Sequence, residues 1–263
     1  MDILTVENVT AGYGKEPIIH DVTFGIPKGG IFGIIGPNGA GKTTLFKTIS
    51  KVLKPWKGVI RYVGNDIAKI SHKAYAAKVA VIPQFRTAPP PFTVEEFVSM
   101  GRYPHGGRLT RFTPEDRRIV EENIRRLKLE HFRSKRMDNL SGGEMQRVFL
   151  AQGLAQSPEL ILMDEPTSHL DITHKIRILD VISRLSRETG LTALIVLHDL
   201  NLASAYCDFL VMMKHGRIHA RGSANDVLTE ERILEVYETP VRIGEDPAIK
   251  KPHIFFLPQS SQK

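Results

Sequence analysis

The segment GPNGAGKTT, residues 36 to 44, has three glycines, a lysine and two threonines at a spacing suited to binding phosphate. The glycines let the backbone curl so that successive N–H groups point at phosphate oxygens, and a following helix adds its positive end. Lys42 supplies a point charge for the β and γ phosphates, while the Thr43 hydroxyl can ligate Mg2+. The residues assigned to nucleotide binding here are Gly36, Pro37, Asn38, Gly39, Ala40, Gly41, Lys42, Thr43 and Thr44.

A pair of carboxylates follows a second apolar run, in LILMDEPTSHLD. Asp164 ends the run and is the expected anchor for Mg2+, at the strand edge where ligands collect in parallel sheets. Glu165 is the next residue, well placed to activate water. Alone, such an acidic pair is more often a turn or a helix cap. Beside a complete phosphate loop, it favours a metal-dependent phosphoryl-transfer site.

Three single residues end or precede other apolar runs. His198 closes TALIVLH and could contact the γ-phosphate, whereas Gln84 follows VAVIP and could ligate the metal or position water. Tyr13 could stack on adenine, because a flat aromatic face suits a base. Each of these residues could equally be structural if considered alone.

A second glycine-rich loop occurs in LSGGEMQR, residues 140 to 147. Ser141 and Glu144 have the spacing of a capping box, which predicts a helix starting at this point. The structural interpretation is that the loop only begins that helix. A chain with one complete phosphate loop has no obvious need for a second.

The elements that must position these residues alternate between strands and helices, which predicts an α/β sheet protein. The apolar strands are expected at 31 to 36, 79 to 83, 160 to 164 and 192 to 198. After the phosphate loop, a helix bearing Val52 and Leu53 on its apolar face is expected to continue until Pro55. Residues 85 to 157 are expected to be mostly helical, with helix starts at Thr93 and Thr113; a hairpin at 209 to 222 and a helix near 229 to 238 complete the prediction.

Composition limits the class of protein. The chain has 263 residues, a net charge of +7, a pI near 9.5 and one cysteine, Cys207. We expect a reducing compartment, no cleavable signal and no spanning helix, and hence a cytosolic protein that does not itself cross a membrane. Much of the basic excess lies in residues 116 to 136, where acidic side chains are interspersed as on an exposed helix. The charge suits an acidic partner or a solvated surface.

These motifs occur together in a known order. Tyr13, GPNGAGKTT, Gln84, LSGGEMQR, LILMDEP, SHLD and His198 resemble the ATP-binding subunits of ABC transporters over residues 1 to about 240. The resemblance implies an α/β P-loop NTPase (RecA-like) core, an N-terminal antiparallel β subdomain and an inserted α-helical subdomain. It places the core at 1–84 and 158–240, the helical signature subdomain at 85–157 and a C-terminal tail at 241–263, which could be a docked strand or a disordered end.

The resemblance also explains the second loop. In ABC proteins the signature loop grips the γ-phosphate held by a second subunit, so two chains share two ATP molecules across a two-fold axis. It implies an active ATPase with ATP and Mg2+ as cofactors. The residues implied in the shared site are Ser141, Gly142, Gly143, Glu144 and Asp171; those in catalysis are Glu165, His198, Gln84 and Lys42; and those at the metal are Thr43, Gln84 and Asp164.

The segments TVEEFVSMGRYPH, PTSHLDITHKIRILD and VLHDLNLASAYCD are similar to ATPases of importers for ferric siderophores, heme and cobalamin. The implied partners are a second ATPase subunit, an integral-membrane permease and, indirectly, a solute-binding protein, with no nucleic acid, at the cytoplasmic face of the membrane. An exporter or another metal importer is the alternative. DNA-repair and ribosome-associated ABC proteins carry long coiled coils, zinc modules or two cassettes, which this chain lacks.

One segment is expected to receive the permease. Prolines and paired glycines flank a short helix within residues 85 to 107, which permits movement around it. Phe92, Phe97 and Met100 are expected to offer apolar contacts to a docked helix. An ordinary surface loop is the alternative.

Overall fold

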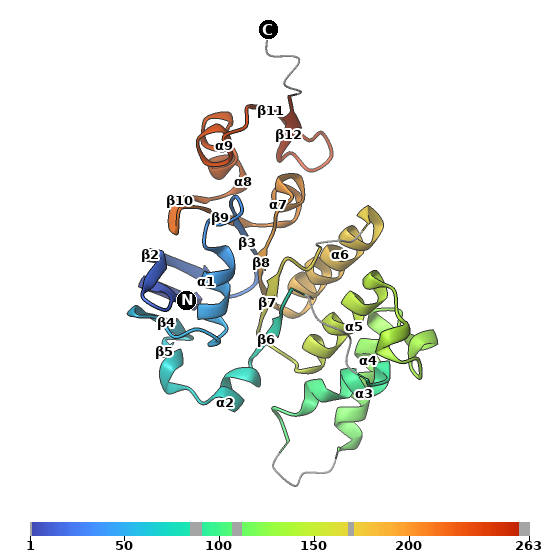
Figure 1. Ribbon diagram of the computed structural model, residues 1–263. Helices are drawn as coiled ribbons and strands as arrows, with labels where there is room; N and C mark the ends of the chain where they lie inside the picture. The colour runs from blue at the N-terminus through green and yellow to red at the C-terminus, as the bar shows by residue number, and fades with distance from the viewer. Residues whose placement is uncertain (1, 85–90, 107–111, 168–170, 258–263) are drawn as a thin grey trace. The chain divides into compact units, whose positions relative to one another are not determined.

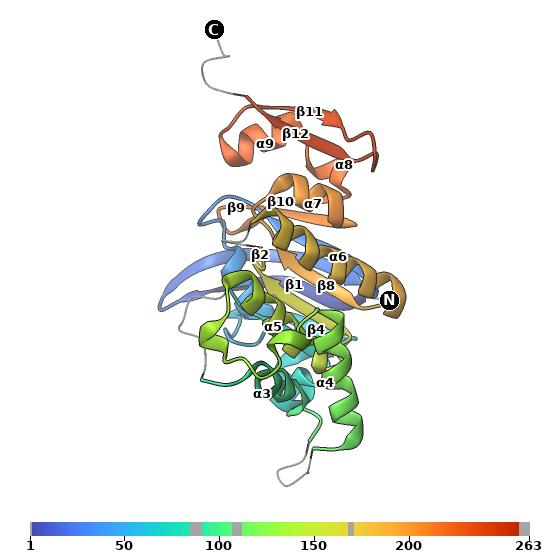
Figure 2. The same ribbon diagram turned by 90° about the vertical axis from the view of Figure 1, so that its right-hand side faces the viewer.

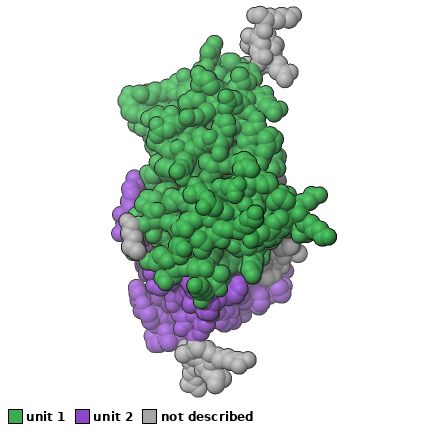
Figure 3. All heavy atoms as spheres, turned by 90° about the vertical axis from the view of Figure 1, so that its left-hand side faces the viewer, with its two compact units in different colours: residues 1–69, 194–263 green, residues 70–193 purple. Residues whose placement is uncertain are grey.

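The computed structural model describes residues 2–84, 91–106, 112–167 and 171–257. The chain forms two compact units, residues 1–69 with 194–263 and residues 70–193 (Figure 3). The predicted division into a core (1–84 and 158–240), a helical subdomain (85–157) and a tail (241–263) stays a prediction, because compact units need not coincide with functional domains.

Unit 1 begins with an antiparallel sheet in the order β2-β1-β4-β5 (Figure 1). Leu4 and Val6 of the long first strand are buried in alternation, as expected for a sheet with one covered face. A register shift between Val6 and Val9 then moves the buried set to Val9 and Ala11. The strands are β1 (Asp2–Tyr13), β2 (Glu16–Pro27), β4 (Lys57–Tyr62) and β5 (Asn65–Asp66).

A second sheet in unit 1 carries the phosphate loop. Its strands are β10 (Arg217–Gly222), β9 (Phe209–Lys214) and β3 (Gly30–Ile35), followed by β8 (Thr192–Val196), within which the boundary between the units falls. β9 pairs in parallel with β3 and antiparallel with β10, which confirms the predicted hairpin.

The helix after the loop is shorter than predicted. α1 (Lys42–Ile49) ends six residues before Pro55, and Val52 is 73% exposed. Lys51 has φ 63°, and the amides of Val52 and Leu53 both bond back to the carbonyl of Lys47. A left-handed residue therefore ends the helix, and Val52 and Leu53 do not continue its apolar face.

The C-terminal part of unit 1 consists of three short helices and a hairpin, which cluster together in Figure 2. These elements are α7 (Leu200–Tyr206), α8 (Ala224–Val227), α9 (Glu230–Tyr237), β11 (Val241–Glu245) and β12 (Pro252–Phe256). Unit 1 also contains the short helix η1 (Ile67–Lys69), which follows β5. α9 confirms the helix predicted near 229 to 238. Residues 241 to 256 of the predicted tail form the antiparallel hairpin β11–β12, and residues 258 to 263 lie outside the described part.

Unit 2 combines buried parallel strands with the predicted helices. β6 and β7 pair in parallel next to β8, and α3 and α4 both pack against α5. Thr93 and Thr113 both begin helices, as predicted, and both cap them with complete capping boxes. The elements are α2 (His72–Ala76), β6 (Val79–Ile82), α3 (Val94–Ser99), η2 (Met100–Arg102), α4 (Pro114–Arg126), η3 (Glu130–Phe132), η4 (Met137–Asn139), α5 (Gly142–Ala155), β7 (Leu160–Asp164) and α6 (Ile172–Thr189).

Candidate nucleotide site and docking surface

The phosphate loop of unit 1 lies between the buried strand β3 and α1. Gly36 and Gly41 require glycine, because a Cβ there would lie 2.4 Å from the carbonyl oxygen of Met213 and 2.7 Å from Ile19, respectively. Gly41 also has φ 96° and precedes α1 without a side-chain cap. The first turn of the helix thus lacks a side-chain acceptor and directs its N–H groups toward the loop.

Lys42 is almost fully buried within its own loop. Its ammonium donates hydrogen bonds to the carbonyl oxygens of Gly36 at 2.7 Å and Pro37 at 2.9 Å, and the side chain is only 5% exposed. Asn38 and Gly39 are exposed, whereas Thr43 is half-buried. The lysine is therefore pre-positioned inside a loop whose tip is open to solvent.

Two further predicted residues of unit 1 flank this loop. Tyr13 ends β1 with its ring 48% exposed, and the Lys47 ammonium lies 5.5 Å from the ring centroid. His198 is exposed and directly follows Leu197, whose amide donates to the carbonyl of Ile34 at 3.0 Å. His198 consequently leaves the sheet beside the strand that runs into the phosphate loop.

In unit 2 the strand register brings Gln84 and Glu165 together. Ile82 of β6 is paired with Met163 of β7, so the residues two positions later leave the sheet side by side. The Gln84 amide Nε2 donates to a Glu165 carboxylate oxygen at 2.7 Å. Asp164 ends β7 and is 5% exposed. Glu165 has φ 50°, a conformation that costs a non-glycine residue about 1 kcal/mol or more and that often occurs at functional sites.

The signature loop begins α5 with the predicted capping box. The Ser141 amide donates to the Glu144 carboxylate at 2.8 Å, and the Glu144 amide donates to the Ser141 hydroxyl at 3.3 Å. These hydrogen bonds lower the pKa of Glu144, because they favour the ionised carboxylate. Ser141 and Gly142 are exposed, so this helix start is accessible to a partner.

The structure connects the signature loop to Asp171 through a residue that sequence reasoning missed. Asp171 caps α6 by accepting from the His174 amide at 2.9 Å, and the His174 ring Nδ1 lies 2.9 Å from the same carboxylate. These contacts lower the pKa of Asp171. The other side of the ring lies against Gly143, where a Cβ would be 2.5 Å away. The i,i+3 spacing of Asp171 and His174 at a helix start could have indicated the pair; residues 168 to 170 lie outside the described part.

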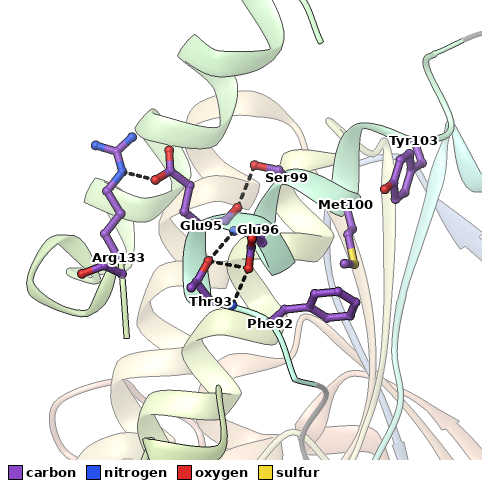
Figure 4. A pocket seen from close by; sticks show the side chains of 9 residues that line it. Phe92, Thr93, Glu95, Glu96, Ser99, Met100, Tyr103 and Arg133 are labelled. Carbon is purple, nitrogen blue, oxygen red and sulfur yellow. Dashed lines mark hydrogen bonds and ion pairs between the residues drawn. The ribbon is translucent and has the colours of Figure 1, made fainter. Parts of the chain in front are cut away.

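A groove lies over α3, where the permease contact was predicted (Figure 4). It has a volume of about 540 Å³ and is lined by Phe92, Thr93, Glu95, Glu96, Ser99, Met100, Tyr103, Arg133 and Ser134. Phe97 is not among the residues that line this groove, and its predicted contact with the permease stays a prediction. Its ring instead packs edge-on against Phe149 of α5, with centroids 4.9 Å apart. Residues 85 to 90 of the predicted segment, and residue 107, are not among those described.

The fold and these side chains define a class of protein. A phosphate loop between a strand and a helix and an Asp-Glu pair at the end of a parallel strand are the parts of a P-loop nucleoside triphosphatase. Among the described helices, none has the length and apolar character needed to span a bilayer.

Comparison with known proteins identifies the family. The model of the family described as "ABC transporter" matches residues 19–168, more than half of the chain. The iron(3+)-hydroxamate import ATP-binding protein FhuC of Bacillus subtilis is 39% identical over 252 residues, covering 96% of this chain and 94% of the relative. The ferric enterobactin transport ATP-binding protein FepC of Escherichia coli is 39% identical, covering 94% and 91%.

A solved structure, the ADP conformation of MJ1267, an ATP-binding cassette of an ABC transporter, matches with a TM-score of 0.79 and 28% identity. The match covers 90% of this chain and 99% of that one. The chain belongs to the ABC transporter family, as an ATP-binding subunit that hydrolyses ATP. The predicted family and fold class are thereby confirmed.

Proposed function

We propose that this chain hydrolyses ATP to drive a membrane permease that imports an iron-siderophore, heme or cobalamin-type solute. The observation that carries the proposal is the 39% identity, over nearly the whole length, to relatives named for ferric hydroxamate and ferric enterobactin transport. The proposed location is the cytoplasmic face of the membrane, beside the permease and indirectly served by a solute-binding protein.

Nucleotide binding is assigned to residues of the phosphate loop and to Tyr13. The exposed ring of Tyr13 offers a face for adenine, and the nearby Lys47 adds positive charge. Lys42 exchanges its contacts with loop carbonyls for contacts with the β and γ phosphates. The backbone N–H groups at the start of α1 bind the remaining phosphate oxygens.

The donor set fits Mg2+. A threonine hydroxyl, an aspartate carboxylate and a glutamine amide oxygen are hard oxygen ligands, which Mg2+ prefers together with phosphate oxygens. The amide nitrogen of Gln84 bonds Glu165, and its amide oxygen would be the atom that ligates the metal. Thr43, Gln84 and Asp164 would hold the ion, which when bound neutralises charge on the transferring phosphate.

Hydrolysis is assigned to Glu165, with Gln84 and His198 as supporting groups. The carboxylate accepts a proton from the attacking water, Gln84 fixes the orientation of that carboxylate, and His198 donates a hydrogen bond to the γ-phosphate.

Glu165→Gln is expected to keep ATP affinity and to lower the hydrolysis rate by about 100-fold or more. Lys42→Ala is expected to weaken ATP binding itself. Near-normal turnover in Glu165→Gln would remove the general-base assignment.

The groove over α3 is the proposed docking surface for a cytoplasmic helix of the permease. Phe92 and Met100 offer apolar contacts, and Tyr103, which also lines the groove, is 74% exposed. A cysteine replacing Tyr103 is expected to crosslink to the permease more efficiently than one replacing Leu234 on α9. The native Cys207 is expected to crosslink little, because it is buried and burial raises the pKa of its thiol to about 12. Crosslinks formed only from position 234 would place the permease elsewhere.

Solute import is tested directly in cells that lack this chain but keep its permease. Restoring the wild-type chain is expected to restore uptake of a ferric hydroxamate, ferric catecholate, heme or cobalamin, each supplied separately, whereas Lys42→Ala is expected to restore none. Uptake of no member of this set, or efflux instead of uptake, would overturn the assignment to siderophore-type import.

A further inference from the structure

Unit 2 contains a second concave site that none of the residues assigned to ATP or to the permease helps to form. It has a volume of about 240 Å³ and lies between the end of α4, the middle of α5 and α6. We call it the arginine pocket. Its lining is Arg126, Leu127, Lys128, Arg147, Arg177, Ile178, Asp180, Val181 and Arg184.

The pocket carries more positive than negative charge. Five cationic side chains line it, against one carboxylate, Asp180. Arg126 is paired with Glu122 at 2.8 Å, which leaves four cations without an ion pair among the described residues. Arg118 on the exposed part of α4, by contrast, is paired with both Glu115 and Glu122 of the same helix. The positive charge of the pocket is therefore less fully compensated than that of Arg118.

Arg147 is held at the centre of this cluster. Its Nη1 donates to the carbonyl oxygens of Leu127 at 3.1 Å and Lys128 at 3.3 Å, so the end of α4 fixes the guanidinium. Its Nε is buried and has no hydrogen-bond acceptor among the described residues. Burial lowers the pKa of Arg147, and the like charge of Arg177 adds to that effect while Glu144 opposes it. The surroundings of Arg147 in the folded protein thus stabilise its guanidinium cation poorly.

The chemistry of the lining selects the ligand. Planar guanidinium groups match phosphate oxygens with two hydrogen bonds each, and the buried Leu127 and Ile178 lower the local dielectric, which strengthens those bonds. A single chloride would neutralise only one of several cations. The small volume favours a compact ligand over a peptide or a nucleic acid.

We propose that the arginine pocket binds a small free anion with two or more phosphate groups, with inorganic pyrophosphate as its simplest representative. The pocket shares no residue with the phosphate loop, so the two sites can be occupied by different ligands. The pocket is lined by residues of α4, α5 and α6, so a bound anion would fix the end of α4 to the other two helices. The signature loop begins α5, one of these helices.

The test is calorimetric titration of pyrophosphate into the full chain at fixed ionic strength, with excess ADP present to occupy the phosphate loop. One site is expected, and it is also expected in Lys42→Ala. The double variant Arg177→Ala/Arg184→Ala should weaken this binding about tenfold or more, since each lost charged hydrogen bond is costly. The matched control is Arg125→Ala/Arg187→Ala, which removes the same charge from two arginines of α4 and α6 that do not line the pocket, and should change the affinity less than about twofold.

Three results would overturn the proposal. They are no binding of pyrophosphate to ADP-saturated chain, equal weakening in the two double variants, and pocket-dependent binding seen only with vesicles of anionic phospholipid. Circular dichroism and the melting temperature of both double variants show that each is folded before titration.

Discussion

Two adjacent glycines of the signature loop have different structural environments. A Cβ at Gly143 would lie 2.5 to 2.8 Å from the His174 ring, whereas a Cβ at Gly142 meets no heavy atom within 4 Å. We predict that Gly143→Ala lowers the free energy of unfolding by about 1–3 kcal/mol through overpacking, while Gly142→Ala has an effect below about 0.5 kcal/mol. Urea unfolding of both variants checks this. Equal stability of the two variants would contradict the packing of His174 on Gly143.

The hydrogen bond between Gln84 and Glu165 is charge-assisted and joins the ends of two parallel strands. Loss of such a bond costs about 1.5–3 kcal/mol, so Gln84→Ala is predicted to lower the ATP hydrolysis rate about tenfold or more. Gln152→Ala on α5 serves as the control. Hydrolysis measured at saturating ATP should separate the two variants, and unchanged turnover in Gln84→Ala would show that Glu165 does not depend on this amide.

At the scale of elements, the C-terminal hairpin is attached to α7, the helix that follows His198. The Asn201 side chain donates to the Ile254 carbonyl at 3.2 Å and accepts from the Ile254 amide at 2.8 Å. The buried Ser204 hydroxyl donates to the Pro252 carbonyl at 2.6 Å, and the Lys251 ammonium donates to the Cys207 carbonyl at 3.0 Å. The hairpin is thus a docked element, one of the two forms considered for the tail.

We predict that Asn201→Ala weakens the docking of this hairpin by about 1–2 kcal/mol, since it leaves both Ile254 backbone groups without these bonds. Hydrogen exchange of the Ile254 amide should become faster by about tenfold. Arg242→Ala, which removes only an exposed ion pair with Glu230, is the control and should leave that amide unchanged. Slow exchange in Asn201→Ala would mean that strand pairing alone holds the hairpin.

The start of α4 carries a pH-dependent contact. Hydrogen bonds from Thr113, together with Arg102 at 2.8 Å, lower the pKa of Asp116 from 3.8 to about 2. Because the folded-state pKa is the lower one, this contact stabilises the fold above about pH 4 and is lost as the pH falls toward 2. The stability difference between wild type and Asp116→Asn should therefore be constant above about pH 5 and shrink below about pH 4. A difference that does not vary with pH would contradict this account; Glu121→Gln is the control.

Sequence alone predicted the elements whose signal is local. The buried strands, the capping boxes at Thr93 and Ser141, the helix start at Thr113 and the hairpin β9–β10 follow from patterns within a few residues. The end of α1 was missed because a left-handed Lys51, rather than Pro55, stops that helix.

Contacts between distant segments were harder to predict. Phe97 is half-buried on α3, a helix of only 6 residues, which is too short for helical periodicity to indicate that its ring packs on Phe149. The contact of His174 with Gly143 joins two helices that only the fold brings together. The register of β6 on β7, which pairs Gln84 with Glu165, also has no local signal.

For the whole molecule, we propose that two chains form the complete nucleotide sites. The exposed start of α5 at Ser141 and Gly142 is an N–H-rich helix end suited to phosphate, and we assign it to the nucleotide held by a second subunit. On this proposal, bound ATP would stabilise the dimer by mass action and hydrolysis would release it. A variant that binds ATP without hydrolysing it should accumulate as the closed dimer.

The most direct test of this claim is the solution mass of Glu165→Gln, measured by light scattering with and without ATP and Mg2+. We expect a monomer without nucleotide and a stable dimer with ATP, and we expect the additional change Ser141→Arg to abolish the dimer while ATP still binds. A Glu165→Gln chain that stays monomeric with ATP bound, or a dimer that persists when Ser141 is arginine, would contradict it.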